Sequence, residues 1–166
     1  MEIRKADVSS IDDIMILIGD CINNMRIKGI YQWNEEYPNK DVFLNDISCN
    51  TLYILWDNDS LIGIVVLNEV PSPGYERINW KDIRGRALFV HRLAVHPSFQ
   101  GKGYAKALMD FTEEYAKMNG YSSIRLDAYT GNHRAMKLYE LRGYSDNGQV
   151  CFEGRDLPFN CYEKLV

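Results

Sequence analysis

Residues 93–111 read LAVHPSFQGKGYAKALMDF, and this stretch decides the expected fold. Its apolar start predicts a strand that ends at Val95, and the apolar residues after Gly103 recur at the three- and four-residue steps of a helix. The turn between them contains Gly101 and Gly103. Glycine lets successive backbone N–H groups point into one concavity, and the following helix adds its positive N-terminal end. The stretch therefore predicts an anion site, with phosphate as the natural ligand.

The spacing in this stretch excludes two common phosphate-binding motifs. A Walker loop requires glycine in place of His96 and Ser or Thr in place of Gly103. A dinucleotide-binding fingerprint that starts at Gly101 requires a small residue where the sequence has Lys106. The pattern that fits is Gln or Arg, two residues, Gly, one residue, and then Gly or Ala, starting at Gln100.

A second motif lies about one strand and one turn downstream. Asn132, Ala135, the pair Leu138-Tyr139 and the pair Gly143-Tyr144 follow the pattern N-x-x-A-x-x-L-Y-x-x-x-G-F/Y. The two motifs at this separation resemble the GNAT superfamily of acetyl-coenzyme A-dependent N-acetyltransferases, and the resemblance covers residues 87–144 closely. Taken alone, the two glycines have an ordinary strand-to-helix turn as their alternative explanation, and the second motif argues against it.

The whole chain has the pattern of an α/β protein, in the element order that suits this superfamily. We expect one domain over residues 1–166, with a central mixed, mostly antiparallel sheet of about seven strands flanked by about four helices. Ser10 and Asp13 predict a capping box at the start of the first helix. Strands are expected at 2–5, 51–56, 61–69, 87–95, 122–129, 149–153 and 159–165, and helices at 11–28, 39–49, 103–118 and 132–143.

Composition narrows the class of protein further. The 166 residues are 46% hydrophobic, which suffices for a packed core, and the net charge of −4 argues against nucleic acid or an anionic membrane as partner. No targeting or membrane-spanning segment is evident, so a cytoplasmic protein is expected. The cysteines are widely spaced, without a CxxC pair or a His cluster, and are expected to be free, mostly buried thiols with no metal: Cys21, Cys49, Cys151 and Cys161.

Carried onto this sequence, the resemblance implies how acetyl-coenzyme A is held. Main-chain groups of residues 93–95 would pair with the pantetheine arm as with an added strand, and backbone N–H groups of residues 101–106 would hold the pyrophosphate. Gln100 would brace the loop, and Asn132 would bond the pantetheine while also capping its helix. The implied site comprises Leu93, Ala94, Val95, Gln100, Gly101, Lys102, Gly103, Tyr104, Ala105, Lys106, Asn132, Ala135 and Tyr139.

The chemistry requires an acid and a base. Tyr139 is expected to protonate the leaving thiolate, with core packing as the alternative reading. The attacking amine must be neutral, although a lysine-like amine is charged at neutral pH. Histone-type members place a glutamate where this chain has Phe89. We therefore expect ordered water to remove the proton, with His91 or Glu69 as the side chain nearest to that water. Glu76 and Asp127 are the other candidate bases. The alternative role for Asp127 is an ion pair with a neighbouring arginine.

The acceptor pocket is expected in the variable segments 31–37 and 71–86. Four aromatic residues can enclose an amine by cation–π contact, although their rings could equally pack under a loop: Tyr31, Trp33, Tyr75 and Trp80. Glu35, Glu36 or Glu76 can attract the charge of the amine. A small-molecule or amino-acid-like amine is the preferred acceptor, before a protein N-terminus or lysine. A non-catalytic coenzyme A-binding sensor or scaffold is the alternative from another class, and the resemblance leaves room for a homodimer.

Overall fold

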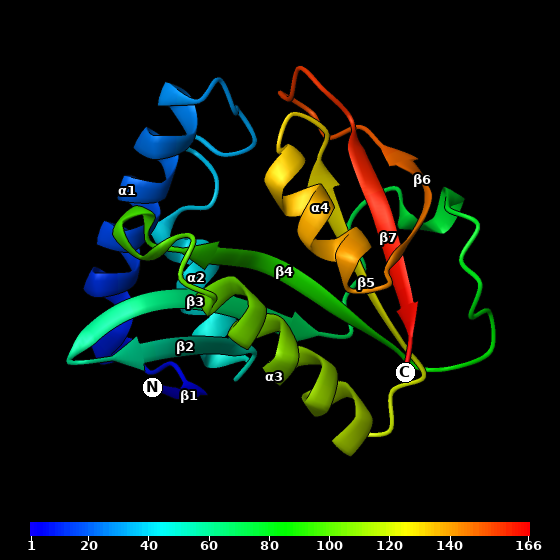
Figure 1. Ribbon diagram of the computed structural model, residues 1–166, viewed down its shortest axis with the longest axis horizontal. Helices are drawn as coiled ribbons and strands as arrows, with labels where there is room; N and C mark the ends of the chain where they lie inside the picture. Colours follow the sequence, from blue (N-terminus) through cyan, green and yellow to red (C-terminus); the bar gives the residue numbers. More distant parts are fainter. The chain divides into compact units, whose positions relative to one another are not determined.

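A computed structural model describes residues 1–166, and the chain divides into two compact units. Unit 1 comprises Met1–Gly29, Trp33–Leu67 and His91–Phe111, and unit 2 comprises Ile30–Gln32, Asn68–Val90 and Thr112–Val166. Seven strands form one sheet in the order β1-β2-β3-β4-β5-β7-β6, and four α-helices accompany it (Figure 1). The β4–β5 pair is parallel, whereas β1–β2, β2–β3, β5–β7 and β6–β7 are antiparallel. This confirms the predicted mixed, mostly antiparallel fold; the single domain stays a prediction.

The helices and strands lie close to the predicted ranges. The strands are β1 (Glu2–Lys5), β2 (Leu52–Asp57), β3 (Ser60–Asn68), β4 (Ala87–Val95), β5 (Ser123–Tyr129), β6 (Ser145–Val150) and β7 (Phe159–Leu165). The α-helices are α1 (Ile11–Ile27), α2 (Lys40–Ser48), α3 (Tyr104–Met118) and α4 (His133–Leu141). Three short 3-10 helices complete the chain: η1 (Val8–Ser10), η2 (Tyr75–Arg77) and η3 (Pro97–Phe99).

In unit 1, the β2–β3 hairpin is covered on both faces. Alternate strand residues such as Ile54 and Ile64 pack with the apolar stripes of α1 and α2, because successive side chains of a strand point to opposite faces. On the other face, the rings of Tyr53 on β2 and Phe111 on α3 lie 5.0 Å apart. This layering fixes where α3 begins and therefore where the loop before it lies.

In unit 2, β5 lies between β4 and β7 in the sheet (Figure 1), and aromatic side chains pack on both of its faces. Tyr129 and Cys161 belong to a buried cluster on one face, together with Tyr75 from the loop 71–86. On the other face, the ring of Tyr139 on α4 lies 5.9 Å from that of Tyr162 on β7. The long loop is thus packed onto the sheet, which accounts for its aromatic content.

Three local predictions are wrong. Ser10 makes no side-chain capping bond at α1; instead Asp7 caps the preceding η1, because its carboxylate accepts from the Ser9 N–H group. The sixth strand is Ser145–Val150 and not 149–153, since pairing with β7 selects a segment of low strand propensity. Cys49 and Cys151 are exposed, so only half of the free cysteines are buried.

Two further observations bear on the class of protein. None of the helices combines the length and the apolar character that crossing a membrane requires. No group of three or more His, Cys, Asp or Glu side chains is arranged to hold a metal ion.

Candidate functional site

The predicted pyrophosphate loop of unit 1 leads from η3 into α3. Gly101 and Gly103 have φ angles of +83° and +90°, a conformation that favours glycine because a Cβ would be strained there. A Cβ built on Gly103 meets no atom within 4 Å, so backbone conformation and not crowding requires glycine. Gln100 ties the loop to β4, because its Nε2 donates to the carbonyl oxygen of Val95 over 3.0 Å.

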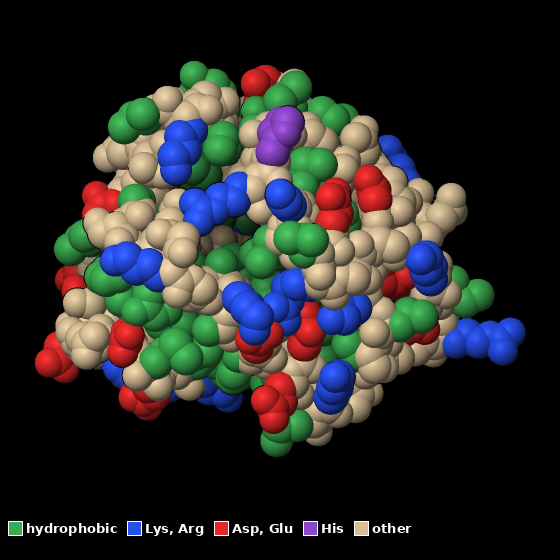
Figure 2. All heavy atoms as spheres, viewed as in Figure 1, with side chains coloured by type: hydrophobic (Ala, Val, Ile, Leu, Met, Phe, Trp, Pro, Cys, Tyr) green, Lys and Arg blue, Asp and Glu red, His purple; other side chains and the backbone are tan.

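The first turn of α3 completes this loop. The Ala107 N–H group donates to the Gly103 carbonyl oxygen over 3.0 Å, whereas the N–H groups that precede it in a helix have no intrahelical acceptor. The Tyr104 hydroxyl donates to Asp57 over 2.8 Å and anchors α3 to the hairpin. Lys102 and Lys106 are exposed, and Figure 2 shows basic side chains over this part of the surface. The loop therefore offers unpaired backbone donors and positive charge to an anion.

The end of β4 presents its backbone next to the loop. The His96 N–H group donates to the carbonyl oxygen of Ile62 on β3 over 2.9 Å, so strand alternation directs the main-chain groups of Leu93 and Val95 to the opposite edge. The Val95 carbonyl oxygen already accepts from Gln100 and, over 3.5 Å, from the Cys21 thiol. Its N–H group is thus the better placed of the two for an added strand.

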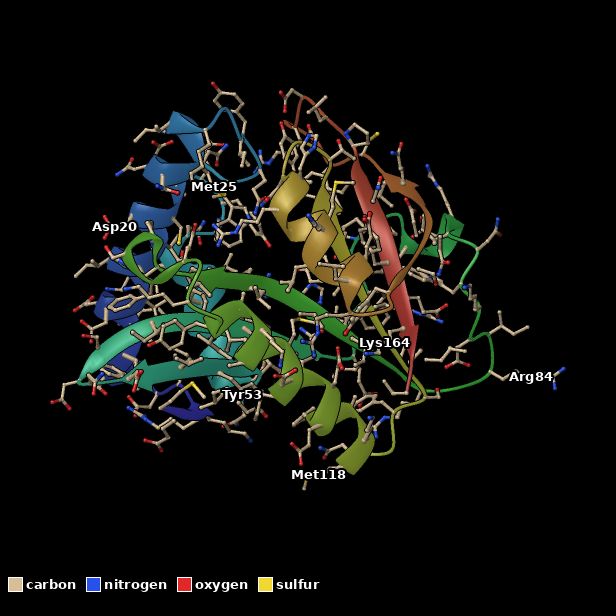
Figure 3. The ribbon with its side chains drawn as sticks, in the orientation of Figure 1. Asp20, Met25, Tyr53, Arg84, Met118 and Lys164 are labelled. Atoms are coloured by element: carbon tan, nitrogen blue, oxygen red, sulfur yellow. The ribbon has the colours of Figure 1, made fainter.

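Two polar pairs that the sequence did not reveal fix this region. Arg92 has a φ of +50° within β4, and Asp46 of α2 accepts two hydrogen bonds from its guanidinium group. His96 Nε2 lies 3.0 Å from Asp20 of α1, which Figure 3 shows beside η3 and the loop after it. The partners are more than forty residues apart in the chain, so no local pattern indicates them.

In unit 2, Asn132 is held on both sides of its amide. Its Oδ1 accepts from the Ala135 N–H group over 3.2 Å, which is the predicted helix cap. Its Nδ2 donates to Gln32 Oε1 over 3.0 Å, and Arg155 holds the Gln32 carbonyl oxygen over 2.7 Å. Gln32 is therefore an additional residue at this position, and its place in the aromatic segment 31–37 gave no sign of it.

Tyr139 is buried on the inner face of α4, where its ring packs between Tyr144 and Tyr162. Burial raises the pKa of its hydroxyl, and the nearby charge of Asp127 raises it further. The group therefore keeps its proton at neutral pH, as a general acid must. Its role in catalysis stays a prediction.

The two preferred base candidates differ in their surroundings. Glu69 is exposed and forms an ion pair with Arg86, and the Tyr121 hydroxyl donates to it over 3.0 Å. These hydrogen bonds lower the pKa of Glu69, so it is a weaker proton acceptor than an unpaired carboxylate. His91 is half-buried on β4, and its part in the reaction also stays a prediction.

Asp127 of β5 does not form the ion pair with an arginine that was the alternative prediction for it. Its partners are hydroxyl groups. The Tyr75 hydroxyl donates to Oδ2 over 2.7 Å, and the Ser72 hydroxyl lies 3.4 Å from the same atom. The neighbouring Arg125 instead pairs with Glu163 over 3.0 Å. Burial raises the pKa of Asp127 against the lowering effect of both hydrogen bonds.

The predicted acceptor residues have different environments, and Tyr75 is buried in the cluster on the sheet of unit 2. Tyr31 and Glu76 are exposed in unit 2, and Glu76 lies 3.5 Å from Arg77. Trp80 packs on the cluster around Tyr75 and donates from its indole nitrogen to the Tyr75 carbonyl oxygen over 2.9 Å. Trp33 packs on the core of unit 1. Packing thus explains both tryptophans, and an acceptor role for these residues stays a prediction.

Comparisons with known proteins agree with this geometry. The chain matches the model of the Acetyltransferase (GNAT) family over residues 21–144. It is 23% identical over 164 residues to the uncharacterized N-acetyltransferase YesJ of Bacillus subtilis, across 96% of this chain and 86% of YesJ. It is 24% identical over 131 residues to streptothricin acetyltransferase of Escherichia coli, across 79% of this chain and 66% of that protein.

A solved structure extends the likeness to the whole fold. The crystal structure of a GNAT-family acetyltransferase from Streptococcus agalactiae aligns with a TM-score of 0.86 and 25% identity, over 99% of this chain and 95% of that one. The matched family model includes both the glycine loop and the motif that starts at Asn132. The chain belongs to the GNAT family, which confirms the prediction of an acetyl-coenzyme A-dependent N-acetyltransferase.

Proposed function

We propose that this enzyme moves the acetyl group of acetyl-coenzyme A to the primary amine of a small molecule or amino-acid-like acceptor. The amine attacks the thioester directly while both substrates are bound, so no acetylated enzyme forms. Cys21 and Cys161, the buried thiols, have pKa values raised by burial to about 12, and such thiols are poor nucleophiles at neutral pH. This supports direct transfer over a route through these cysteines.

The loop at residues 100–103 carries the proposal. Two glycines with positive φ, the N–H groups at the start of α3 and the exposed Lys102 provide a surface of hydrogen-bond donors in unit 1. Successive N–H groups in this arrangement bind phosphate oxygens. We assign the pyrophosphate of acetyl-coenzyme A to it, and the main chain of residues 93–95 to the pantetheine arm.

The acceptor class follows from charge and from one relative. The net charge of −4 and the carboxylate of Asp127 favour a cationic acceptor. Streptothricin acetyltransferase, named for a small-molecule acceptor, matches 79% of this chain. The charge favours an acceptor that carries an ammonium group, and the relative favours a small amine over a macromolecule.

An amine screen tests the proposal. Purified protein is mixed with acetyl-coenzyme A and, in separate reactions, putrescine, L-lysine, benzylamine or a peptide with a free N-terminus, and free thiol is followed over time. We expect thiol release with at least one small amine and little with the peptide. Faster release with the peptide would shift the acceptor to protein. Calorimetric binding of acetyl-coenzyme A without release in any reaction would favour a non-catalytic binding module.

A further inference from the structure

We propose that Asp127, held by Tyr75 and Ser72, binds the ammonium group of the acceptor and accepts its proton. This inference rests on the proposed function and deepens it, because it names the base and the charge of the acceptor. All residues that carry it lie in unit 2.

The hydrogen bonds around Asp127 leave one side of the carboxylate available. The bonds from Tyr75 and Ser72 both end on Oδ2, and the residue keeps part of its surface exposed. Both donors come from the loop 71–86, which is packed on the sheet through the buried ring of Tyr75. The carboxylate is therefore fixed in orientation by donors that leave Oδ1 for a third partner.

Asp127 lacks the cation that the buried acidic groups Asp46 and Glu163 have. Its recorded partners are two neutral hydroxyls, and no Lys or Arg side chain pairs with it. Even partial burial of a carboxylate is costly when no cation is nearby, unless a partner supplies the charge. A substrate ammonium would supply it. Three other acidic side chains of low exposure form ion pairs with basic residues: Asp46 with Arg92, Glu163 with Arg125, and Glu113 with Arg142 and Lys164.

Asp127 lies on the face of β5 that carries Tyr75 and Cys161, whereas Tyr139 packs with Tyr162 on the other face. The charge of Asp127 contributes to the raised pKa of Tyr139 on α4 and of Cys161 on β7, and the strand register pairs Asp127 with Cys161 directly. The titratable groups whose pKa values the charge of Asp127 raises are thus Tyr75 of η2, Cys161 of β7 and, across the sheet, Tyr139 of α4. All three are neutral at neutral pH, so none competes with a substrate for the carboxylate.

The step balances with these two groups. One proton of the ammonium passes to Asp127, and the freed lone pair forms the C–N bond while the C–S bond breaks. The thiolate leaves with the proton of Tyr139, and Tyr139 regains a proton as the nitrogen loses its second one. Asp127 releases its proton to water, so one proton is produced for each thiol formed.

Asp127→Asn tests the assignment. Asparagine still accepts the hydrogen bonds of Tyr75 and Ser72 but cannot take a proton. We expect kcat for the best small amine of the screen to fall about 100-fold or more at pH 7, with acetyl-coenzyme A affinity and melting temperature unchanged. With hydroxylamine, which is largely unprotonated at neutral pH, the loss should be much smaller. Asp156→Asn is the control, because Asp156 also accepts a hydrogen bond from a tyrosine hydroxyl, that of Tyr129 over 2.5 Å.

The pH dependence of kcat/KM distinguishes a catalytic role of Asp127 from a purely structural one. Wild-type kcat/KM should fall at low pH as Asp127 becomes protonated, and Asp127→Asn should lose this limb. Tyr75→Phe removes a hydrogen bond that lowers the pKa of Asp127, so it should move the limb to higher pH.

Three results would overturn the inference. Wild-type turnover and an unchanged acidic limb in Asp127→Asn would remove Asp127 as the base, as would an equal loss with hydroxylamine and amine together with a lowered melting temperature. Wild-type protein that binds acetyl-coenzyme A but acetylates neither hydroxylamine nor any amine would instead overturn the proposed function, and the inference with it.

Discussion

Asp46 and Arg92 form a buried ion pair within unit 1. The Arg92 Nε and Nη2 groups donate to the two carboxylate oxygens over 2.9 and 2.8 Å, and the side chains are 5% and 12% exposed for Asp46 and Arg92. Arg92 also donates to the Tyr37 hydroxyl over 2.9 Å. Its φ of +50° is unfavourable for a residue with a Cβ. The pair therefore holds an unusual backbone conformation immediately before residues 93–95.

Removing one partner should destabilise the protein strongly. Asp46→Ala leaves a buried guanidinium group without its carboxylate, which costs about 3–5 kcal/mol. Urea unfolding followed by circular dichroism measures this change. Asp12→Ala, which breaks the exposed pair with Lys40, is the control and should cost less than about 1 kcal/mol. Equal losses in the two variants would show that burial does not set the strength of the Asp46–Arg92 pair.

Gly103→Val should weaken acetyl-coenzyme A binding about 10-fold or more by calorimetry. The φ of +90° strains any side chain, and a branched one blocks the approach of the pyrophosphate to the backbone. Gly120→Val is the matched control, because Gly120 also has a positive φ of +72° and open space around it but ends α3. Unchanged affinity in Gly103→Val would contradict the assignment of the pyrophosphate to this loop.

Tyr139→Phe should lower kcat about 10- to 100-fold while acetyl-coenzyme A affinity changes little, because only the proton donor is lost. The raised pKa keeps this hydroxyl protonated, so the wild-type profile should show no basic limb from it near neutral pH. Tyr162→Phe, which removes the hydroxyl of an adjacent buried ring, serves as the control. If both variants turn over at the wild-type rate, Tyr139 is a packing residue only.

Glu113 should make the free energy of unfolding depend on pH in the acidic range. Burial raises its pKa, but the hydrogen bonds and charges of Arg142 and Lys164, at 2.9 Å each, outweigh burial and lower it below the ordinary 4.5 (Lys164 is labelled in Figure 3). A lowered folded-state pKa contributes stability that is present above 4.5 and is lost as pH falls through the folded value.

Urea unfolding of Glu113→Gln measures this contribution. The variant should be about 1–3 kcal/mol less stable than wild type at pH 7, and the difference should shrink between pH 4.5 and pH 3. The exposed neighbour Glu114, changed to Gln, should show neither effect. A stability difference between Glu113→Gln and wild type that stays constant over this pH range would contradict the link between the pKa of Glu113 and stability.

The sequence by itself determined the elements and the loop. Apolar periodicity and glycine punctuation are local properties, so the ranges of α1, α3, β4 and β7 differ little from the prediction. The positive φ of Gly101 and Gly103 also follows from residues that are neighbours in the chain. The sixth strand escaped prediction because only its pairing with β7 makes Ser145–Val150 extended.

Only the tertiary structure decided which polar groups meet. Asp127 and Tyr75 are 52 residues apart, and Asp46 and Arg92 are 46 apart, so no spacing rule connects them. An acidic residue shows in the sequence that it can carry charge, but its partners determine whether it is neutralised. The fold gave Glu69 an arginine and gave Asp127 two hydroxyls. That difference in partners, which depends on packing over long sequence distances, is the physical reason for choosing Asp127 as the base.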